Sequence, residues 1–322
     1  MINKFSYLSR IFNAYVLKKN SQLTFWHGEP EVNTDTDYDR LGKFYQKFSY
    51  KADYPGPFDE NGVIILNYHG EVGEQKYNIA IAQYGLACYN KWKDTGDAKW
   101  FDRFMNQVKW HMDNIKQNEY GIWLWYADFD WDYHGKLKAP WASGLAQGAG
   151  LSLLARAYKE TMDRQYLDLC EKVFKSMATP LEYGGVMAMN RRGFWIEETL
   201  TPSYHILNGF IWAVMGVWDY YLITRDSIIK RWFHRFSDTI ANNLYRYDTG
   251  YWSLYELSDT KMKMLTSYFY HSLHIVQLNI LYNITGNKLF KKYADRWEYF
   301  KNRWIYRKFA YLHKAVFKIF YF

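Results

Sequence analysis

The sequence has 322 residues, of which 49% are hydrophobic and 21% aromatic, and its formal net charge is +8. A chain of this length can form one large domain or two, and its apolar fraction is ample for a buried core. The excess of Lys and Arg favours a polyanion or an anionic lipid surface as a partner. We do not expect nucleic acid as a partner, because no nucleic-acid-binding motif accompanies the charge.

The chain contains two cysteines, Cys88 and Cys170, both in apolar helical contexts. We expect buried thiols and therefore neither a disulfide framework nor a metal site, and no residue pattern calls for a cofactor. Residues 1–19 lack the apolar core and cleavage site of a signal peptide. No run reaches the roughly 18 apolar residues that a membrane-spanning helix needs. These features predict a cytoplasmic protein that is soluble or peripherally bound to a membrane.

Three regions follow from the order of the patterns along the chain. Residues 1–66 are predicted to form a short amphipathic helix over 1–20 and then an extended arm, because Gly, Pro and clustered acidic residues interrupt residues 21–66. Residues 67–302 are predicted to form a helical domain. Residues 303–322 make a basic, aromatic tail.

Within the helical domain one pattern occurs four times. A helix rich in small and apolar residues ends at a tight corner, a second helix carries the charged residues, and a long return follows. A helix that is apolar on most sides is buried on most sides, so the first helix of each pair is expected to lie inside. The corners are 66, 63 and 61 residues apart (161 − 95, 224 − 161, 285 − 224), at Thr95, Thr161, Thr224 and Thr285. Stacked helical hairpins of this kind predict a mainly α fold, an incomplete or full α/α toroid, with the returns building a site at one end.

Two of the returns are rich in polar and aromatic residues. In residues 122–141 aromatic residues alternate with carboxylates and the segment ends at Trp141, a pattern typical of a β-hairpin or of a lip that binds sugar rings. The next return contains four further polar residues, Asn190, Arg191, Glu197 and Glu198. Arginines and glutamates at this spacing either pair at the surface or line a site, where an arginine can hold a carboxylate or sulfate through two hydrogen bonds.

The segment 247–277 carries the groups best suited to proton transfer. Tyr255 lies fifteen residues before Tyr270 (270 − 255), a spacing that allows a loop to bring both phenols together. His271 and His274 lie on one face of a predicted helix. Two tyrosines can remove and return a proton on opposite sides of a carbon if their pKa values are tuned. The alternative is that these residues are core aromatics of an aromatic-rich protein.

Several short motifs occur in order between about residues 55 and 300: Ile81-Ala82-Gln83-Tyr84-Gly85-Leu86, Ala146-Gln147-Gly148, Thr201-Pro202-Ser203, Leu207-Asn208-Gly209-Phe210, Tyr247-Asp248-Thr249-Gly250, and Tyr270-His271 with His274, Gln277 and Leu278. Together they resemble the D-glucuronyl C5-epimerase family, in its α-helical C-terminal catalytic domain. The resemblance implies an α/α helical fold and an isomerase that converts D-glucuronic acid to L-iduronic acid residues by inversion at C5 within a polysaccharide such as heparosan. It implies a uronic-acid-containing polysaccharide as the partner and leaves a homodimer open.

The resemblance places the catalytic tyrosines at Tyr255 and Tyr270. Because a buried Glu can polarise a neighbouring phenol, we expect Glu197 to act with one of them. The expected contacts with the substrate form a larger set: Gln83, Tyr84, Trp141, Gln147, Asn190, Arg191, Glu198, Tyr204, Asn208, His271 and His274. The C5 proton lies α to a carboxylate and is weakly acidic, so preorganised donors must stabilise the enolate-like intermediate. The candidates for that task are Asn190, Arg191 and His271.

One position departs from the family pattern. Family members read Glu-Glu-Tyr-Pro where this sequence has Glu197-Glu198-Thr199-Leu200, so a third functional tyrosine is absent or is replaced by Tyr204. Two alternatives therefore stay open. The same intermediate could expel the C4 substituent, as in a polysaccharide lyase acting by β-elimination, or the protein could be a non-catalytic glycan-binding member of a polysaccharide assembly complex.

The tail, residues 303–322, interleaves cations with apolar and aromatic residues. We expect an amphipathic helix that binds an anionic membrane surface through five cations, Arg303, Arg307, Lys308, Lys314 and Lys318. The alternative is a terminal helix that packs on the domain and seals it.

Overall fold

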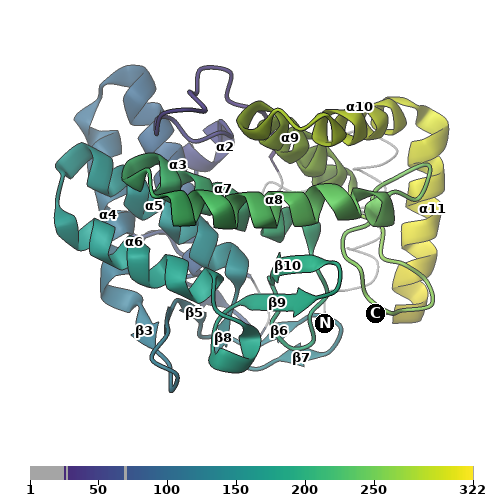
Figure 1. Cartoon of the computed structure of the whole chain (residues 1–322), viewed down its shortest axis with the longest axis horizontal. Coiled ribbons are helices and arrows are strands. Elements are labelled where there is room, and N and C mark those ends of the chain that lie inside the picture. The colour runs from purple at the N-terminus through teal and green to yellow at the C-terminus, as the bar shows by residue number, and fades with distance from the viewer. Residues whose placement is uncertain (1–24, 27, 69–70, 322) are drawn as a thin grey trace.

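The computed structural model describes residues 25–321 except 27, 69 and 70, so the helix expected for residues 1–20 lies outside the described residues. Four helical hairpins follow one another: α3 (Asn78–Thr95) with α4 (Ala98–Asn114), α5 (Gly144–Thr161) with α6 (Arg164–Met177), α7 (Leu207–Thr224) with α8 (Ser227–Tyr247), and α9 (Tyr268–Thr285) with α10 (Lys288–Asn302). The first helices pack side by side in the order α3, α5, α7 and α9, and the second helices are the more exposed ones (Figure 1). The predicted mainly α fold, an α/α toroid of helical hairpins, is confirmed.

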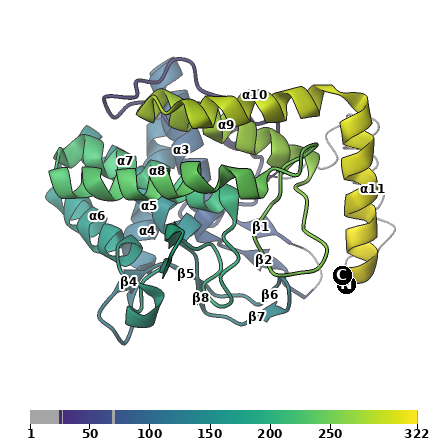
Figure 2. The same cartoon turned by 45° about the vertical axis from the view of Figure 1, so that its right-hand side comes forward.

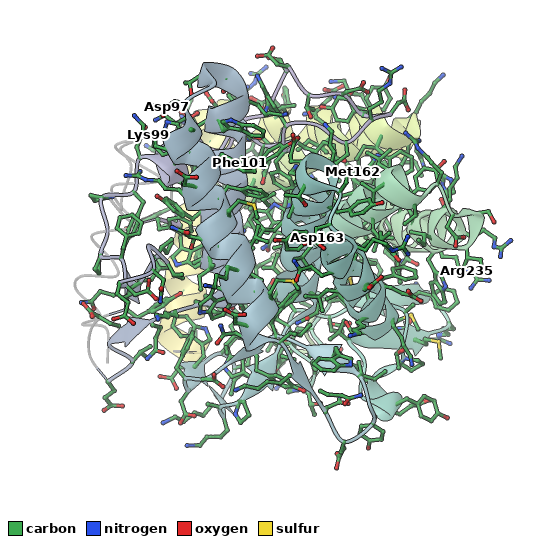
Figure 3. The ribbon with its side chains drawn as sticks, turned by 90° about the vertical axis from the view of Figure 1, so that its left-hand side faces the viewer. Asp97, Lys99, Phe101, Met162, Asp163 and Arg235 are labelled. Atoms are coloured by element: carbon green, nitrogen blue, oxygen red, sulfur yellow. The ribbon has the colours of Figure 1, made fainter. Side chains whose placement is uncertain are left out.

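The four corners share one hydrogen-bond pattern. The threonine that ends each first helix donates its hydroxyl to the carbonyl four residues earlier, at 2.8 Å for Thr161. One left-handed residue follows, and the next backbone N–H donates to the same hydroxyl, at 3.2 Å for Asp163. That Asp or Asn side chain then caps the second helix, 3.0 Å from the Gln165 N–H at this corner, which satisfies a donor that a helix end leaves free. Figure 3 shows Asp97 at one corner and Met162 with Asp163 at another, and the four predicted corners are equivalent.

Small residues let the inner helices approach closely. A Cβ atom on Gly148 of α5 would lie 2.3 Å from the Ala213 Cα of α7, so this pair of helices needs glycine there. A buried ion pair joins the same two helices, with a guanidinium nitrogen of Arg156 2.7 Å from an Asp219 oxygen. The Tyr45 hydroxyl donates to this carboxylate at 2.6 Å. Because Tyr45 belongs to the N-terminal arm, the contact fixes the arm to the inner helices.

Short antiparallel strands build the returns and gather on one side of the molecule (Figures 1 and 2). The pairs are β1 (Leu66–Asn67) with β2 (Glu74–Gln75), β3 (Lys116–Gln117) with β4 (Trp123–Leu124), β5 (Tyr126–Ala127) with β8 (Trp141–Ala142), β6 (Trp131–Asp132) with β7 (Lys136–Leu137), and β9 (Met187–Asn190) with β10 (Gly193–Ile196). The hairpin predicted within residues 122–141 is present as β6–β7. Two short helices, α2 (Ser49–Ala52) and the 3₁₀ helix η1 (Leu181–Tyr183), lie in the remaining segments.

The tail forms one helix, α11 (Trp304–Tyr321), at the rim of the molecule (Figure 2). It packs on the domain through Ala310, Lys314 and Phe317. The predicted helix is present, but two of the five cations expected to bind a membrane surface, Arg307 and Lys314, are buried, with only 9% and 6% of their surface exposed. These two cations lie on the same side of the helix as Phe317, and that side packs against the domain. Among the described residues, none of the helices combines the length and the apolar character that crossing a bilayer requires.

Candidate active site

Tyr255 and Tyr270 lie side by side. Tyr255 belongs to the return between α8 and α9, where its N–H donates to the Met264 carbonyl at 2.9 Å and its carbonyl accepts from Leu207 at 3.1 Å. Tyr270 lies in the first turn of α9, which Ser267 caps. The two ring centroids are 5.0 Å apart with the ring planes at 74°, and a hydrogen bond links the side chains. Burial raises the pKa of both phenols, so each holds its proton at neutral pH.

Glu198 is the acid that faces these phenols. After burial, its charge is the next cause that raises the pKa of Tyr255 and of Tyr270, which requires it to lie close to both. The pKa of Glu198 is itself raised to about 8, first by burial and then by the charges of Glu256 and Glu197. Its Oε2 atom has no hydrogen-bond partner within the described part of the chain. A buried carboxyl oxygen without a partner beside two phenols is available to a ligand.

The first turn of α7 leaves room for Glu198. A Cβ atom on Gly209 would lie 2.1 Å from the Glu198 Oε2 atom, so a larger residue here would displace the Glu198 carboxyl group from its present position. The neighbouring Asn208 is buried, and its carbonyl accepts from the Gln277 amide at 2.9 Å. The Asn208 Oδ1 atom has no partner among the described residues. The Leu207–Phe210 motif therefore has a local physical reason, which is to make space beside the acid.

Glu197 is held by His205. One of its oxygens accepts from the His205 backbone N–H at 3.0 Å, and the other contacts the ring Nδ1 of the same residue. The His205 ring stacks on Trp195 with the centroids 4.1 Å apart. The His205 carbonyl accepts from the Tyr247 hydroxyl at 2.6 Å. The Glu197 carboxylate thus fixes the return that follows β10.

A further buried carboxylate, Glu256, ties the β6–β7 hairpin to the site. It accepts from the Tyr133 hydroxyl and lies 2.6 Å from His134 Nε2, and both partners belong to the tip of the hairpin. The Tyr204 ring packs beside them, 5.7 Å from the Tyr133 ring and 4.7 Å from the His134 ring. The Tyr133 ring lies 6.5 Å from that of Tyr255. Three returns therefore meet around the tyrosine pair.

The three carboxyl groups differ in their partners. Glu197 has the N–H and ring of His205, and Glu256 has a hydroxyl and an imidazole from the hairpin tip. Glu198 instead faces phenols, and its pKa is raised first by burial and then by the charges of Glu256 and Glu197. Near neutral pH Glu198 is largely a neutral acid, and it ionises as the pH approaches 8.

Of the residues predicted to bind a substrate, Tyr204 and Glu198 join the tyrosine pair. Trp141 lies next to this group, because its ring is 6.0 Å from that of Tyr77. The charge of Glu198 is one of the causes that raise the pKa of Tyr77, after burial and the charge of Tyr68. These contacts extend the site from the tyrosine pair towards the β5–β8 strands.

The two predicted histidines brace the loop before Tyr255. His271 Nδ1 lies 2.8 Å from the Ser253 hydroxyl, and His271 Nε2 lies 3.0 Å from the Trp297 carbonyl. His274 Nδ1 lies 3.3 Å from the same hydroxyl. Burial lowers the pKa of His271 well below its ordinary value and that of His274 to about 3, so both rings are neutral at physiological pH.

The remaining predicted contacts lie on the inner helices or at an exposed turn. Gln83 and Tyr84 are buried on α3. Gln147 braces Trp125, because its side chain accepts from the Trp125 N–H at 3.1 Å and donates to its carbonyl at 3.1 Å. At the exposed β9–β10 turn lie the last two, Asn190 and Arg191.

Sequence reasoning missed four groups of the site. Tyr133 and His134 bind the carboxylate of Glu256, more than 120 residues away in the chain, and no local sequence pattern predicts such a contact. Glu256 is adjacent to Tyr255, which is the one signal that could have identified it. Tyr77 lies immediately before α3 and was not distinguished from the other aromatic residues.

The family model described as D-glucuronyl C5-epimerase C-terminus matches residues 117–299, which is more than half of the chain. The chain belongs to this family. The matched residues include both tyrosines of the pair, Glu198 and the β6–β7 hairpin, whereas α11 lies beyond them.

The chain is also similar to individual proteins. An uncharacterized protein of Methanocaldococcus jannaschii is 28% identical over 180 residues, which are 54% of this chain and 56% of that protein. The D-glucuronyl C5-epimerase of Caenorhabditis elegans is 28% identical over 173 residues, 49% of this chain and 28% of that protein. The chain thus spans only part of the length of these relatives. A solved sugar epimerase from a ruminal bacterium has a TM-score of 0.53 at 14% identity, over 92% of this chain and 74% of that one, a likeness of fold.

Proposed function

We propose that this protein is a carbohydrate epimerase that inverts C5 of D-glucuronic acid residues in a polysaccharide to give L-iduronic acid. One observation carries the proposal. The buried phenol of Tyr255 and the partly buried phenol of Tyr270 share a hydrogen bond beside an acid, Glu198, whose pKa is about 8. Membership of the D-glucuronyl C5-epimerase family supports a uronic acid as the substrate.

Glu198 has two tasks in this proposal. Ionised Glu198 accepts the proton of a neighbouring phenol, which creates the phenolate that the reaction needs as a base. Once protonated, Glu198 donates a hydrogen bond to the carboxylate of the sugar. Removal of the C5 proton makes that carboxylate enolate-like, and a preorganised donor then stabilises the added charge.

The two tyrosines divide the proton transfers at C5. One phenolate accepts the C5 proton, and the phenol on the opposite face donates its own proton to the same carbon. The sugar thus keeps its number of protons, and the negative charge passes from one tyrosine to the other. When the product leaves, the hydrogen bond between Tyr255 and Tyr270 offers a path for the proton to return.

Other phenols take the place of the tyrosine that is absent at Thr199. The Thr199 side chain is buried and donates to the Pro202 carbonyl at 3.2 Å, so it serves the return itself. Tyr204 and Tyr133 pack together within the same cluster as Tyr255. We assign them to the sugar that neighbours the reacting one.

A strip of half-buried aromatic rings provides a path for the polymer. The Tyr68 ring lies 6.5 Å from Tyr77 and 5.4 Å from Trp131, and Tyr77 lies 6.0 Å from Trp141. Aromatic rings that keep part of one face accessible are suited to stacking on sugar rings. The strip begins at the phenols beside Glu198 and leads to the β5–β8 and β6–β7 strands.

Incubation with heparosan, followed by NMR of the uronate signals, tests the proposal. We expect iduronate signals with the wild-type protein and none with Tyr270→Phe. Ultraviolet absorbance of an unsaturated uronate would instead identify a lyase. Binding of heparosan without either product would identify a glycan-binding protein, and both results would contradict the proposal.

A further inference from the structure

The side of α11 that faces away from the domain is apolar. Six of its side chains are 41% to 75% exposed, and from the second of them they recur every three or four residues: Trp304, Ile305, Phe309, Leu312, Val316 and Phe320. We call these six residues the outer face of α11. A contiguous exposed apolar surface is uncommon on a soluble monomer and marks a place of interaction.

The outer face has no role in packing the helix on its own domain. That role belongs to the opposite side, where Ala310, Lys314 and Phe317 are buried. In Figures 1 and 2 α11 stands at the rim across the end of α10, and no described element covers its outward side. The helix also lies beyond residues 117–299, the part of the chain that matches the family.

The charged residues of α11 itself have one sign. From residue 299 to residue 322 the sequence contains six Lys and Arg residues and no Asp or Glu. Arg303 and Lys308 are exposed, and the Lys308 ammonium lies 4.7 Å from the centre of the Trp304 ring. A second copy docked about a two-fold axis would place this face against itself and bring cations together without acids to neutralise them. Anionic lipid headgroups would complement the same charges.

We propose that the outer face of α11 docks the protein on an anionic membrane surface. The helix lies in the plane of the interface with its apolar side chains among the headgroups. Trp304, Phe309 and Phe320 supply aromatic rings, which favour this depth of the bilayer. Because Arg307 and Lys314 are buried, insertion of apolar side chains contributes more to binding than the charge pattern of the sequence predicted.

Docking by this face places the candidate active site beside the membrane. On the inner side of α11, Phe317 belongs to the same buried cluster as Tyr255. The Lys314 ammonium donates to the Leu265 carbonyl at 2.7 Å, in the return that carries Tyr255. A polymer attached to the membrane would therefore reach the site without leaving the surface.

Sedimentation of the full chain with lipid vesicles tests the proposal. The vesicles are phosphatidylcholine mixed with phosphatidylglycerol, and phosphatidylcholine alone is the neutral arm. The test variant is Phe309→Ser with Leu312→Ser, and the matched control is Ile228→Ser, an exposed apolar residue of α8. We expect the wild-type protein and the control to sediment with the anionic vesicles. The partition coefficient of the test variant should be lower than that of the wild type by a factor of about ten or more. Added salt should weaken binding.

Two results would overturn the proposal. One is equal binding by the wild-type protein and the Phe309→Ser, Leu312→Ser variant, with the fold of both checked by circular dichroism. The other is a wild-type protein that does not bind the anionic vesicles. If such a protein also self-associates through these residues in sedimentation velocity, the outer face serves contact between copies.

Discussion

Glu197 and Glu198 are adjacent in the chain, yet their surroundings give them different properties. His205 supplies both a backbone N–H and a ring nitrogen to Glu197. Glu198 has an oxygen without a partner among the described residues and a pKa of about 8. An acid that changes charge near neutral pH beside two phenols suits proton transfer, whereas a fully engaged carboxylate suits the support of a loop.

Removal of a single hydroxyl from the tyrosine pair should abolish activity. Tyr255→Phe and Tyr270→Phe are each expected to lower kcat on heparosan by a factor of about 100 or more, because a proton-transfer group is lost. The melting temperature should change little, since the rings remain in place. Tyr89→Phe is the matched control, because Tyr89 is a buried phenol of α3 that donates to Glu160, beside the corner at Thr161. A Tyr270→Phe enzyme as active as this control would exclude the assigned role.

The proposed task of Glu198 predicts a pH profile. The ionised acid must accept a phenol proton, so kcat/KM should rise as the pH increases through about 8. Glu198→Gln cannot ionise, so its residual activity should lack this rise. A wild-type profile that is flat between pH 6 and pH 9 would contradict the assignment, with both limits taken about one to two units from that pKa.

The same acid predicts how stability depends on pH. Its folded pKa of about 8 lies above the ordinary value of 4.5, so between these values the folded state holds a proton that the unfolded state has lost. The free energy of unfolding should therefore fall with rising pH across this window, by at most about 1.4 kcal/mol per pH unit. Thermal unfolding should show a smaller decline for Glu198→Gln, and parallel curves for both proteins would argue against the buried acid.

At the scale of the element, the corners repeat because one short pattern satisfies the backbone at both helix ends. Each threonine hydroxyl donates to a carbonyl of the first helix, and the Asp or Asn two residues later caps the second helix. Neither interaction depends on the rest of the fold. The architecture is for this reason readable from local sequence.

Loss of one cap should lower stability without changing the fold. Asp226→Ala is expected to reduce the free energy of unfolding by about 1 kcal/mol, because the Ile228 N–H at the start of α8 loses its acceptor. Asp226→Asn retains an acceptor and should be nearly neutral. Urea unfolding of both variants measures the difference, and an Ala variant as stable as the Asn variant would mean that the cap contributes nothing.

The side-chain arrangement of the returns and of α11 is harder to predict from the sequence than that of the corners. The backbone after β10 is irregular, so the sequence does not say which of two adjacent glutamates faces the phenols, and the prediction named Glu197 where the structure brings Glu198 to them. Tyr133 and Glu256 meet only through the complete fold. α11 has two apolar faces, and its periodicity does not decide which one packs inward. The sequence therefore did not show that Arg307 and Lys314 are buried rather than available to a membrane surface.

At the scale of the whole molecule, a buried ion pair connects the N-terminal arm to the inner helices of the toroid. Arg156 and Asp219 are both fully buried, and the Tyr45 hydroxyl of the arm donates to the same carboxylate. Tyr50 lies in the arm and Tyr68 just beyond it, and the pKa of each is raised by burial and secondarily by Tyr270. The ion pair therefore supports the shape of the site from a distance.

Breaking this pair on one side should be more damaging than removing it. Arg156→Met leaves the Asp219 carboxylate buried without its cation and is expected to cost about 3–5 kcal/mol of the free energy of unfolding. Arg156→Met combined with Asp219→Leu should recover most of that loss. Chemical denaturation of both proteins measures the difference, and equal losses would show that burial of an unpaired charge is not the cause.

In the proposed reaction, two tyrosines on opposite faces of the sugar exchange the C5 proton. Heparosan incubated in deuterated water with the wild-type enzyme, and stopped at low conversion, tests it most directly by NMR of each uronate. With two proton-transfer groups, deuterium should appear at C5 of the iduronate product while the remaining glucuronate stays protonated. Equal deuterium in product and remaining glucuronate would indicate a single group on one face, and iduronate without deuterium would exclude proton exchange with the solvent through these phenols.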